Sequence, residues 1–456
     1  MKFFLSFIFF SQVYLLSAQE VEIRNIHIEG LKKTKESVVL RELSFKVGEK
    51  VTLDEVPLIL AESKQNLQNQ WLFNFIEFTP TLEDQQLDIK LKVIERWYVW
   101  PYPIFEISER NFNVFWDSLH NSQFTDFSNL NYGVFLNWYN FRGRNELLKI
   151  KYRIGFKEHY QLEYEVPFLN RAKTWGASLN LELFQMKKFQ YKTDRHELVY
   201  TKLGENQMKD QKFSLSIQYK PKLHNTHKFS VEKTQMSTLQ PVDNPLFFLN
   251  QDKHFNYLKL DYYFRREKRD YIIYPLEGNM SEVWIEYYNG LKNDYENISL
   301  TTKLEYHYNI YPRWFIGSSL KTKKYWKNNL PYILNQSFGY DDYLRGYEYY
   351  VIDGSAFALS KTALKWTLLP KNDFQLPFIP MESISKTHFS IYLSIFADVG
   401  YVRNFDETNN PLNNKLLMSQ GFSMDVVSYY DKLIRLECSR NHMGETGFYL
   451  HFSNPF

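Results

Sequence analysis

A two-residue alternation of apolar and polar side chains runs from about residue 132 to the end of the chain. Within 212–220, for example, Phe213, Leu215, Ile217 and Tyr219 alternate with lysine, serine and glutamine. Successive side chains of a β-strand point to opposite faces, so each segment of this kind predicts a strand with one apolar and one polar face. Sixteen such segments follow one another, of which the first is 132–140, the fifth 189–201 and the last 447–456.

The lengths of these segments and of their connectors favour a membrane barrel. A tilted strand crosses a bilayer with about 9 to 11 residues, whereas strands of soluble sheets average about 5 to 6. The alternation assigns connectors 142–145, 203–210, 237–254 and 325–354 to one rim, and connectors 157–158, 187–188 and 311–312 to the other. Long loops at one rim and short turns at the other are typical of outer-membrane barrels. We therefore expect 132–456 to form a mainly β structure, a sixteen-stranded antiparallel transmembrane β-barrel, with a soluble all-β protein as the alternative.

The composition agrees with a barrel and excludes other classes. The chain has 38 Phe, 34 Tyr and 10 Trp, and such rings settle at membrane interfaces and on the lipid face. A charged fraction of 23% and a mean hydropathy of -0.46 exclude a bundle of membrane helices. The net charge of +3 gives no sign of a nucleic-acid partner. A single Cys excludes an internal disulfide framework.

The residues before the alternation divide into three parts. Residues 1–18 predict a signal peptide, because Lys2 precedes an apolar stretch that ends in Ala18. Residues 19–97 predict a small α/β domain of order β-α-α-β-β, in which Thr34 caps the first helix and Pro57 lies in the first turn of the second. Residues 98–131 are expected to be a linker that leads into the barrel.

Four short motifs occur in order along the predicted barrel. They are Asn140-Phe141-Arg142-Gly143-Arg144, Tyr274-Pro275-Leu276-Glu277-Gly278, Leu344-Arg345-Gly346-Tyr347 and Phe396-Ala397-Asp398-Val399-Gly400. With the α/β module and the sixteen strands, they resemble the BamA/TamA-type outer-membrane assembly factors, in which periplasmic POTRA domains precede a C-terminal barrel. The resemblance covers essentially the whole mature chain. It departs from better-known members in having room for one POTRA domain, where they carry two to five.

The resemblance implies that the loop carrying Leu344 to Tyr347 folds back into the barrel lumen, against the strand of Phe396, Asp398 and Gly400. The alternation places Asp398 on the lumen face, and a partly desolvated Arg345 needs an anionic partner, so we expect a bidentate Arg345–Asp398 pair. A solvated arginine and an unrelated aspartate are the alternative. Members of the family often carry a Glu on the strand after the loop, where this chain has Ala363. The loop is therefore expected to be held less firmly, or by other contacts.

The resemblance also implies a mechanism without covalent chemistry. Substrate strands would add to a lateral seam between the first and last strands, and the POTRA domain would capture extended segments. The residues assigned to that seam are Tyr132, Asn140, Gly447, Phe448, Leu450, Phe452 and Phe456, and the turn motifs contribute Gly143, Pro275 and Gly278. The alternation turns Phe448, Leu450 and Phe452 outward.

The expected partners are unfolded outer-membrane or exported proteins, membrane lipid, and periplasmic or lipoprotein accessory subunits bound through the POTRA domain. The expected location is the bacterial outer membrane, with the POTRA domain in the periplasm. The alternatives are a passive channel, or a lipid or lipoprotein exporter on the same barrel. A membrane hydrolase is disfavoured, because His388, His442 and His451 have no triad spacing and Cys438 lies in an alternating strand. No catalytic residue, cofactor or metal site is predicted.

Overall fold

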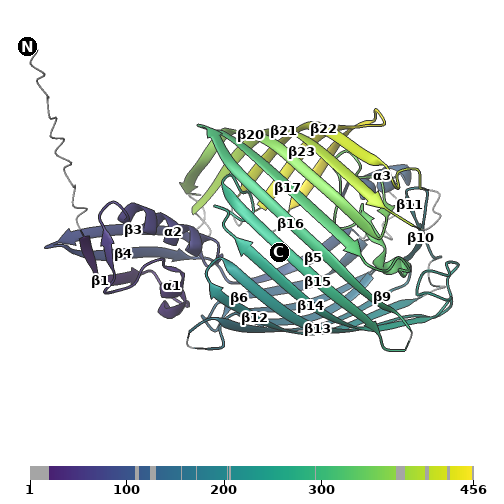
Figure 1. Cartoon of the computed structure of the whole chain (residues 1–456), viewed down its shortest axis with the longest axis horizontal. Helices are drawn as coiled ribbons and strands as arrows, with labels where there is room; N and C mark the ends of the chain where they lie inside the picture. The colour runs from purple at the N-terminus through teal and green to yellow at the C-terminus, as the bar shows by residue number, and fades with distance from the viewer. Residues whose placement is uncertain are drawn as a thin grey trace, which may run out of the picture.

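A computed structural model shows a small N-terminal α/β domain beside one rim of a large β-barrel (Figure 1). The residues that it describes are 20–107, 112–123, 130–155, 157–170, 172–202, 204, 207–292, 294–375, 386–405, 410–428 and 432–453. The predicted signal peptide and Phe456 lie outside the described residues. Among the residues described, no helix has the length and apolar character that crossing a membrane requires.

The N-terminal domain is a four-stranded mixed sheet with two helices. Its elements are β1 (Glu20–Glu29), α1 (Glu36–Glu42), β2 (Lys50–Thr52), α2 (Val56–Gln68), β3 (Phe73–Glu83) and β4 (Gln86–Glu95). The strand order is β2-β1-β4-β3, with β1 and β4 parallel. The sequence did not indicate β2, because three residues are too few for a periodic signal. Pro57 lies in the first turn of α2 as predicted, whereas Lys35, not Thr34, occupies the N-cap of α1.

The barrel is one sheet of sixteen strands in which each strand pairs antiparallel with its neighbour. The strands are β5 (Val99–Ile107), β6 (Leu130–Phe141), β7 (Glu146–Gly155), β8 (Lys157–Val166), β9 (Trp175–Met186), β12 (Met208–Lys222), β13 (Asn225–Thr238), β14 (His254–Glu267), β15 (Gly278–Gly290), β16 (Glu296–Tyr311), β17 (Trp314–Tyr325), β20 (Ala356–Gln375), β21 (Lys386–Arg403), β22 (Leu416–Ser428), β23 (Lys432–Asn441) and β24 (Thr446–Ser453). The predicted fold class and strand number are confirmed.

Two assignments at the start of the barrel were wrong. The first strand is β5, within the segment expected to be a linker, and segment 189–201 forms the separate hairpin β10 (Gln190–Asp194) and β11 (Glu197–Tyr200). Because β5 joins the barrel and segment 189–201 leaves it, the number of strands remains sixteen. The extra strand at the start places the hairpin turn 142–145 on the rim opposite to the one predicted. That turn lies on the rim beside the N-terminal domain, the near rim, together with the short turn 312–313. The connectors 239–253 and 326–355 lie on the other rim, the far rim, although the near rim also carries the connector 268–277.

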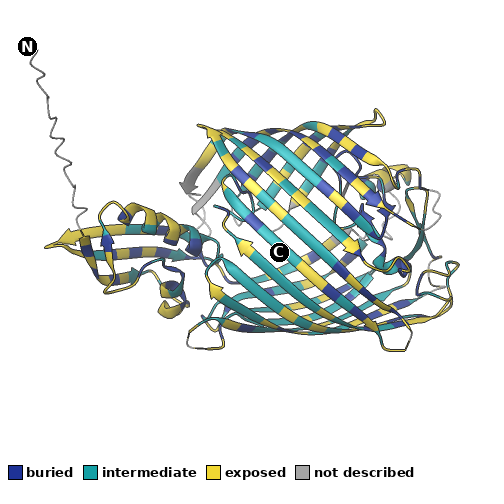
Figure 2. Ribbon diagram, in the orientation of Figure 1, coloured by how far each residue is buried: buried dark blue, intermediate teal, exposed yellow. Residues whose placement is uncertain are grey.

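The two faces of the barrel alternate as the sequence predicts (Figure 2). On β21, Ser394, Phe396 and Asp398 are buried, while Ile395 and Ala397 between them are exposed. The exposed apolar side chains face the surroundings of the barrel, and the buried polar ones face its lumen. Because an apolar band around a closed barrel suits lipid, this alternation fits a membrane setting.

Besides the connector that contains β10 and β11, two further far-rim connectors carry structure of their own. The connector between β5 and β6 contains helix α3 (Phe112–Asn121), which contacts β24. The connector between β17 and β20 contains η1 (Tyr332–Leu334), β18 (Gln336–Phe338) and β19 (Ile352–Asp353). We call this second connector, residues 326–355, the lumen loop.

Candidate functional site: the lumen loop and the barrel seam

The lumen loop folds back into the barrel and forms an apolar core with the strands around it. Leu344 and Ile352 are fully buried, and Tyr347 is 2% exposed. They belong to a cluster with residues of the barrel strands and of one other far-rim connector, namely Phe357, Leu359, Val402, Leu412 and Leu417. Burial of a large apolar side chain stabilises by about 1.5–3 kcal/mol. The loop is thus packed like an interior segment.

Arg345 and Asp398 form the bidentate ion pair that the alternation predicts. The Arg345 Nε donates to Asp398 Oδ2 at 2.7 Å, and a terminal guanidinium nitrogen donates to Oδ1. The guanidinium also stacks on the Phe396 ring, 3.7 Å from its centroid. Gly346 next to it has φ +79°, which an L side chain rarely adopts. The loop therefore turns sharply at the point where its cation meets the strand.

Further contacts fix the rest of the motif. A Cβ on Gly400 would lie 2.6 Å from the Phe338 ring, so only glycine lets the lumen loop approach β21 this closely. Tyr347 donates its hydroxyl to the Met418 carbonyl oxygen at 3.1 Å and also contacts the His442 imidazole. Asn441 donates its amide to the Gly346 carbonyl oxygen at 3.2 Å. The motif thus contacts β21, β22 and the end of β23.

Other groups hold the loop where the acid expected at Ala363 is missing. Ala363 pairs with Phe396 across β20 and β21. The Lys321 ammonium on β17 lies 2.7 Å from both Asp342 carboxylate oxygens. Lys361 on β20 stacks over the Tyr343 ring at 4.2 Å. The loop is therefore anchored by two lysines on neighbouring strands, contacts that its own motif does not reveal.

The Tyr-Pro motif also lies inside the barrel, at the near rim. It belongs to the connector between β14 and β15, which ends at Gly278. Tyr274 is buried, stacks on Tyr392 at 4.5 Å and donates its hydroxyl to Asp425 Oδ2 at 2.8 Å. Lys365 donates to the Pro275 carbonyl oxygen at 3.0 Å. The sequence predicted only a turn here, because nothing in it shows that the turn folds inward.

The seam of the barrel lies between β5 and β24. The sheet ends at these two strands, and among the described residues no ladder joins them. Tyr132 and Asn140, assigned to the first strand by the sequence, lie on the second strand β6 instead, because β5 precedes it. On β24 the outward side chains are as predicted: Phe448 is 81% and Phe452 62% exposed.

Each seam strand has a feature that limits pairing at its free edge. Tyr139 of β6 donates its backbone N–H to the Tyr98 carbonyl oxygen at 2.8 Å, so even-numbered residues of β5 direct their backbone polar groups at β6. Pro101 and Pro103 therefore face the free edge, where they offer no N–H. On β24, the Leu450 N–H donates to Asn113 Oδ1 of α3 at 3.2 Å. Helix α3 thus occupies part of the edge that a closing strand would need.

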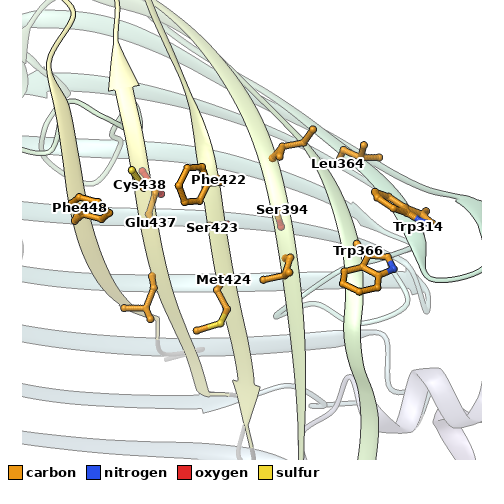
Figure 3. A pocket seen from close by; sticks show the side chains of 13 residues that line it. Trp314, Leu364, Trp366, Ser394, Phe422, Ser423, Met424, Glu437, Cys438 and Phe448 are labelled. Atoms are coloured by element: carbon orange, nitrogen blue, oxygen red, sulfur yellow. The ribbon is translucent and has the colours of Figure 1, made fainter.

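An apolar groove of about 680 Å³ lies on the outer face of the last strands (Figure 3). Its lining includes Leu364, Trp366, Phe422, Met424 and Phe448. Cys438 also lines it, as expected for a lipid-facing thiol on an alternating strand. The groove reaches β24 at Phe448, so a lipid chain lying in it would border the seam.

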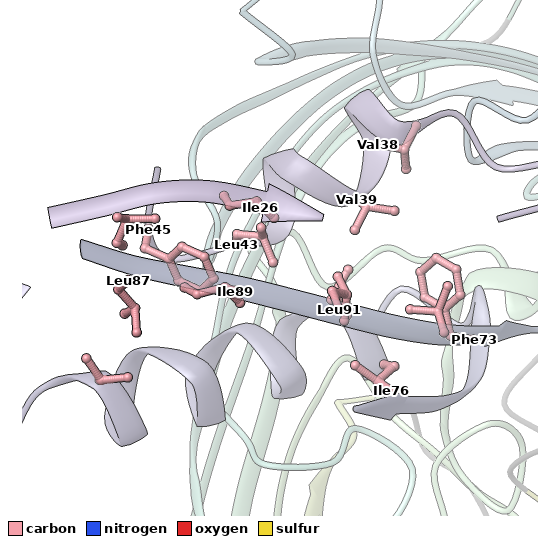
Figure 4. Close-up of a cluster of buried hydrophobic side chains, with 14 of the residues drawn as sticks. Ile26, Val38, Val39, Leu43, Phe45, Phe73, Ile76, Leu87, Ile89 and Leu91 are labelled. Carbon is pink, nitrogen blue, oxygen red and sulfur yellow. The ribbon is translucent and has the colours of Figure 1, made fainter. Parts of the chain in front are cut away.

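The N-terminal domain meets the near rim through a short chain of hydrogen bonds. Its core packs residues of β1, α1 and β3 around β4, where Ile89 and Leu91 are almost fully buried (Figure 4). At its edge, the Asn140 amide donates to Thr34 Oγ1 at 2.8 Å, which lies 2.9 Å from the Tyr98 hydroxyl. Burial raises the pKa of Tyr98, so the hydroxyl keeps its proton and donates to the Leu72 carbonyl oxygen at 3.0 Å.

Gly143 completes this junction. It has φ +72°, and its carbonyl oxygen accepts from the Lys35 N–H at 2.9 Å. A Cβ at this position would lie 2.0 Å from the Lys33 carbonyl oxygen, so any other residue would push the two parts of the chain apart. Asn140 and Gly143 therefore connect the N-terminal domain to the barrel. The sequence assigned Asn140 to the seam, and that assignment was wrong.

Two of the three histidines that the sequence set aside have described side chains, and both lie near the lumen loop. The His388 side chain is outside the described part of the chain. His442 contacts Tyr347 of the lumen loop. His451 stacks on Tyr343, with ring centroids 5.4 Å apart. The two described histidines thus contact the lumen loop.

The fold resembles solved structures of known outer-membrane proteins. It is similar to BamA from Haemophilus ducreyi lacking POTRA domains 1-3, with a TM-score of 0.54 and 14% identity over 95% of this chain and 84% of that one. CdiB from Acinetobacter baumannii gives 0.50 and 12%, over 95% and 73% of the two chains. CdiB from Escherichia coli gives 0.53 and 10%, over 95% and 75%. At these identities the likeness shows the fold alone.

Family comparisons extend the likeness to the sequence. No curated protein matches the chain. A POTRA family described as a surface antigen variable number repeat matches residues 21–96. The Omp85 superfamily domain matches residues 140–430, which is more than half of the chain. The protein therefore belongs to the Omp85 superfamily of bacterial outer-membrane β-barrels.

Proposed function

We propose that this protein inserts other proteins into the outer membrane, or passes them through it, by letting a client strand add to the β5–β24 seam. The observation that carries the proposal is the missing ladder between these strands in the described part of the sheet. An unpaired strand edge presents a row of N–H and C=O groups that can template another strand. No covalent step is needed, because backbone hydrogen bonds drive the addition.

The two seam edges are suited to temporary pairing. Pro101 and Pro103 remove two donors from the β5 edge, so closure of the barrel gains fewer hydrogen bonds than an ordinary strand pair would. Asn113 satisfies the Leu450 N–H on the other edge while no client is present. A client strand would displace α3 from β24. The cost of opening is therefore small, and the β24 edge is protected from unspecific pairing.

The N-terminal domain would present clients from the periplasm. Strand β3 is at the edge of its sheet and pairs only with β4, so its other edge is open to an extended segment. The hydrogen bonds of Asn140 and Gly143 keep this domain beside the near rim. Accessory periplasmic subunits or lipoproteins would use the same domain.

A lipid or lipoprotein exporter is the second candidate. The apolar groove at Phe422 and Phe448 favours it, since an acyl chain there would border the seam. A passive channel is less well supported, because the lumen loop and the Tyr274 connector both fill the lumen with buried contacts.

The proposal is tested by locking the seam with a disulfide. In a Cys438→Ser background, cysteine replaces Phe105 of β5 and, in turn, Phe448, Leu450 or Phe452 of β24. The purified variants are placed in lipid vesicles, and folding of an unfolded outer-membrane barrel protein is followed by its heat-dependent gel mobility. We expect the oxidised pair to stop client folding and reduction to restore it.

The matched control locks an existing ladder. Ile285 of β15 and Leu300 of β16 are cross-strand neighbours, so a disulfide between cysteines at these positions adds a covalent bond without touching the seam. Full client folding by the oxidised seam pair would refute the proposal. Client folding that is absent in every variant, combined with seam-dependent transfer of lipid or lipoprotein, would favour the second candidate.

A further inference from the structure

Three ligand-type side chains from distant parts of the sequence meet in the lumen beside the seam. Glu348 follows Tyr347 in the lumen loop, Glu437 lies on β23 and His451 lies on β24. One ligand atom from each lies within 4.8 Å of the other two. His451 Nε2 is 3.5 Å from Glu348 Oε1 and 3.9 Å from Glu437 Oε2. We propose that these three residues bind a divalent transition metal ion that ties the lumen loop to the last two strands.

The Glu437 carboxylate supplies an independent reason for a cation. Its side chain is 0% exposed, and neither carboxylate oxygen accepts a hydrogen bond within the described structure. A buried carboxylate without hydrogen bonds costs several kcal/mol unless a cation or a proton compensates it. The second carboxylate, Glu348, lies so near that a compensating cation would serve both.

The neighbouring cationic side chains already have partners. Arg345 donates two hydrogen bonds to Asp398, and Arg435 donates to Asp425 Oδ1 at 2.6 Å. Lys361 stacks on Tyr343. The imidazole of His451 is the only group paired with Glu437 among the described ion pairs, and its Nε2 lies at the long distance of 3.9 Å. Among the described ion pairs, the buried Glu437 carboxylate therefore has little positive charge close to it.

The geometry suits a small cation with mixed ligands. Zinc binds imidazole nitrogen and carboxylate oxygen at about 2.0–2.2 Å, which places the ligands of a tetrahedral site about 3.4 Å apart. The observed 3.5 Å and 3.9 Å need only small side-chain shifts. Two carboxylates and one imidazole leave a position for water and favour Zn²⁺, Mn²⁺ or Fe²⁺ over Ca²⁺, which takes six to eight oxygens.

Neighbouring rings hold the imidazole in place. His451 stacks on Tyr343 of the lumen loop at 17° between the ring planes, and the Tyr449 ring of the same strand β24 lies 6.5 Å from the imidazole. A metal ion here would bond the loop, β23 and β24 together. It would add a link between the lumen loop and the strand that ends the sheet, so it would stabilise the plugged state of the barrel.

The experiment measures zinc binding directly. The full chain is purified in detergent without a histidine tag, stripped with a chelator and titrated with ZnCl₂ by calorimetry, with CaCl₂ as a comparison. We expect one saturable zinc site and no calcium site. Glu437→Gln and His451→Gln should each weaken zinc binding by more than about tenfold. Even the loss of a residue that only hydrogen-bonds a metal ligand lowers metal affinity by about tenfold to a hundredfold. X-ray absorption of the zinc form should show nitrogen and oxygen ligands with a single imidazole.

A buried lumen carboxylate that already has partners provides the matched control. Glu286 accepts from Ser299 Oγ at 2.7 Å and lies 3.7 Å from the Lys259 ammonium, so Glu286→Gln should leave zinc binding unchanged. Zinc should also raise the melting temperature of the wild type but not of His451→Gln. Because this side chain is partly exposed, we expect His451→Gln to fold without zinc as the wild type does. No saturable zinc site, equal affinity in Glu437→Gln and His451→Gln, or a site with several imidazoles would overturn the proposal.

Discussion

The side chains of Arg345 and Asp398 are removed from water. They contact each other instead, and the guanidinium also contacts the Phe396 ring. Both side chains are nearly fully buried, at 6% and 0% exposed. Removing one partner of such a pair leaves the other charge buried and uncompensated, which costs about 3–5 kcal/mol. We therefore expect Arg345→Ala to release residues 344–347 from β21 and to impair client folding, while the barrel still inserts into the membrane. Hydrogen exchange of the loop amides measures the release.

Two further variants separate charge from packing. In Arg345→Ala/Asp398→Ala no charge is left unpaired, so part of the lost loop protection should return. The exposed pair of Lys327 and Glu296, with side chains 59% and 54% exposed, is the control, and Lys327→Ala should change stability by less than about 1 kcal/mol. Unchanged loop protection and activity in Arg345→Ala would contradict the role given to the pair.

For single residues, the alternation along a strand predicts which side chains face the lumen. It does not predict which distant segments those side chains contact. Alternation along β21 is enough to turn Asp398 inward, and a buried Arg345 then needs it. The glutamates and histidine of the proposed metal site come from a loop and two strands, so no ligand spacing indicates them. Thr34 illustrates the same limit: it precedes a helix and suits a cap, yet it bonds Tyr98 and Asn140 instead.

The two prolines of β5 explain its weak sequence signal and also limit its pairing at the seam. A strand with Pro101 and Pro103 reads as a linker, because proline is tolerated only where no ladder N–H is needed. The missing N–H groups of these prolines can be tested by substitution. We expect Pro101→Val/Pro103→Val to supply two donors at the seam edge, each worth about 0.5–1.5 kcal/mol when bonded. Closure would then be favoured by about fivefold to a hundredfold, and client folding should slow correspondingly in vesicles.

A proline elsewhere in the barrel provides the comparison. Pro370 lies where β20 departs from regular pairing, between Leu369 and Asn372, so Pro370→Val changes a proline without adding a donor at the seam. Slower hydrogen exchange of β5 and β24 in the double variant, and not in Pro370→Val, would show that the seam has closed. Equal client folding by all three proteins would mean that the β5 edge does not limit the reaction.

Most of the strands follow from periodicity alone, and the errors have identifiable causes. Segment 189–201 alternates well enough to be a barrel strand, but it turns back on itself between β10 and β11 and its Phe189 packs into a loop cluster at the far rim. Periodicity reports which side of a strand is buried, not which sheet buries it. For the same reason no pattern in the sequence indicated that the connector of Tyr274 enters the lumen.

For the molecule as a whole, the junction at Gly143 is one of several contacts between the N-terminal domain and the barrel, since Gln65 also donates to the Arg269 carbonyl oxygen at 2.7 Å and Asn145 donates to Gln70 Oε1 at 2.9 Å. The hydrogen bonds from Asn140 to Thr34 and from Lys35 to Gly143 join segments about a hundred residues apart, so only the folded chain brings them together. If clients pass from the β3 edge to the seam, this junction sets the direction in which they are delivered. A loosened junction should thus reduce client folding without changing the barrel.

Gly143→Val tests this coupling. The new Cβ would meet the Lys33 carbonyl oxygen, and the positive φ adds about 1–2 kcal/mol of backbone strain. Gly204, with φ +81° and nothing within 4 Å of its Cβ position, shares the strain but not the contact, so Gly204→Val is the matched control. Spin labels on the N-terminal domain and the barrel should give a broader distance distribution in Gly143→Val alone, with slower client folding. A distance distribution as narrow as that of the wild type would show that the contact at Gly143 does not hold the N-terminal domain in place. Slow client folding in both variants would show that strain in a turn, and not the loss of the junction, slows the reaction.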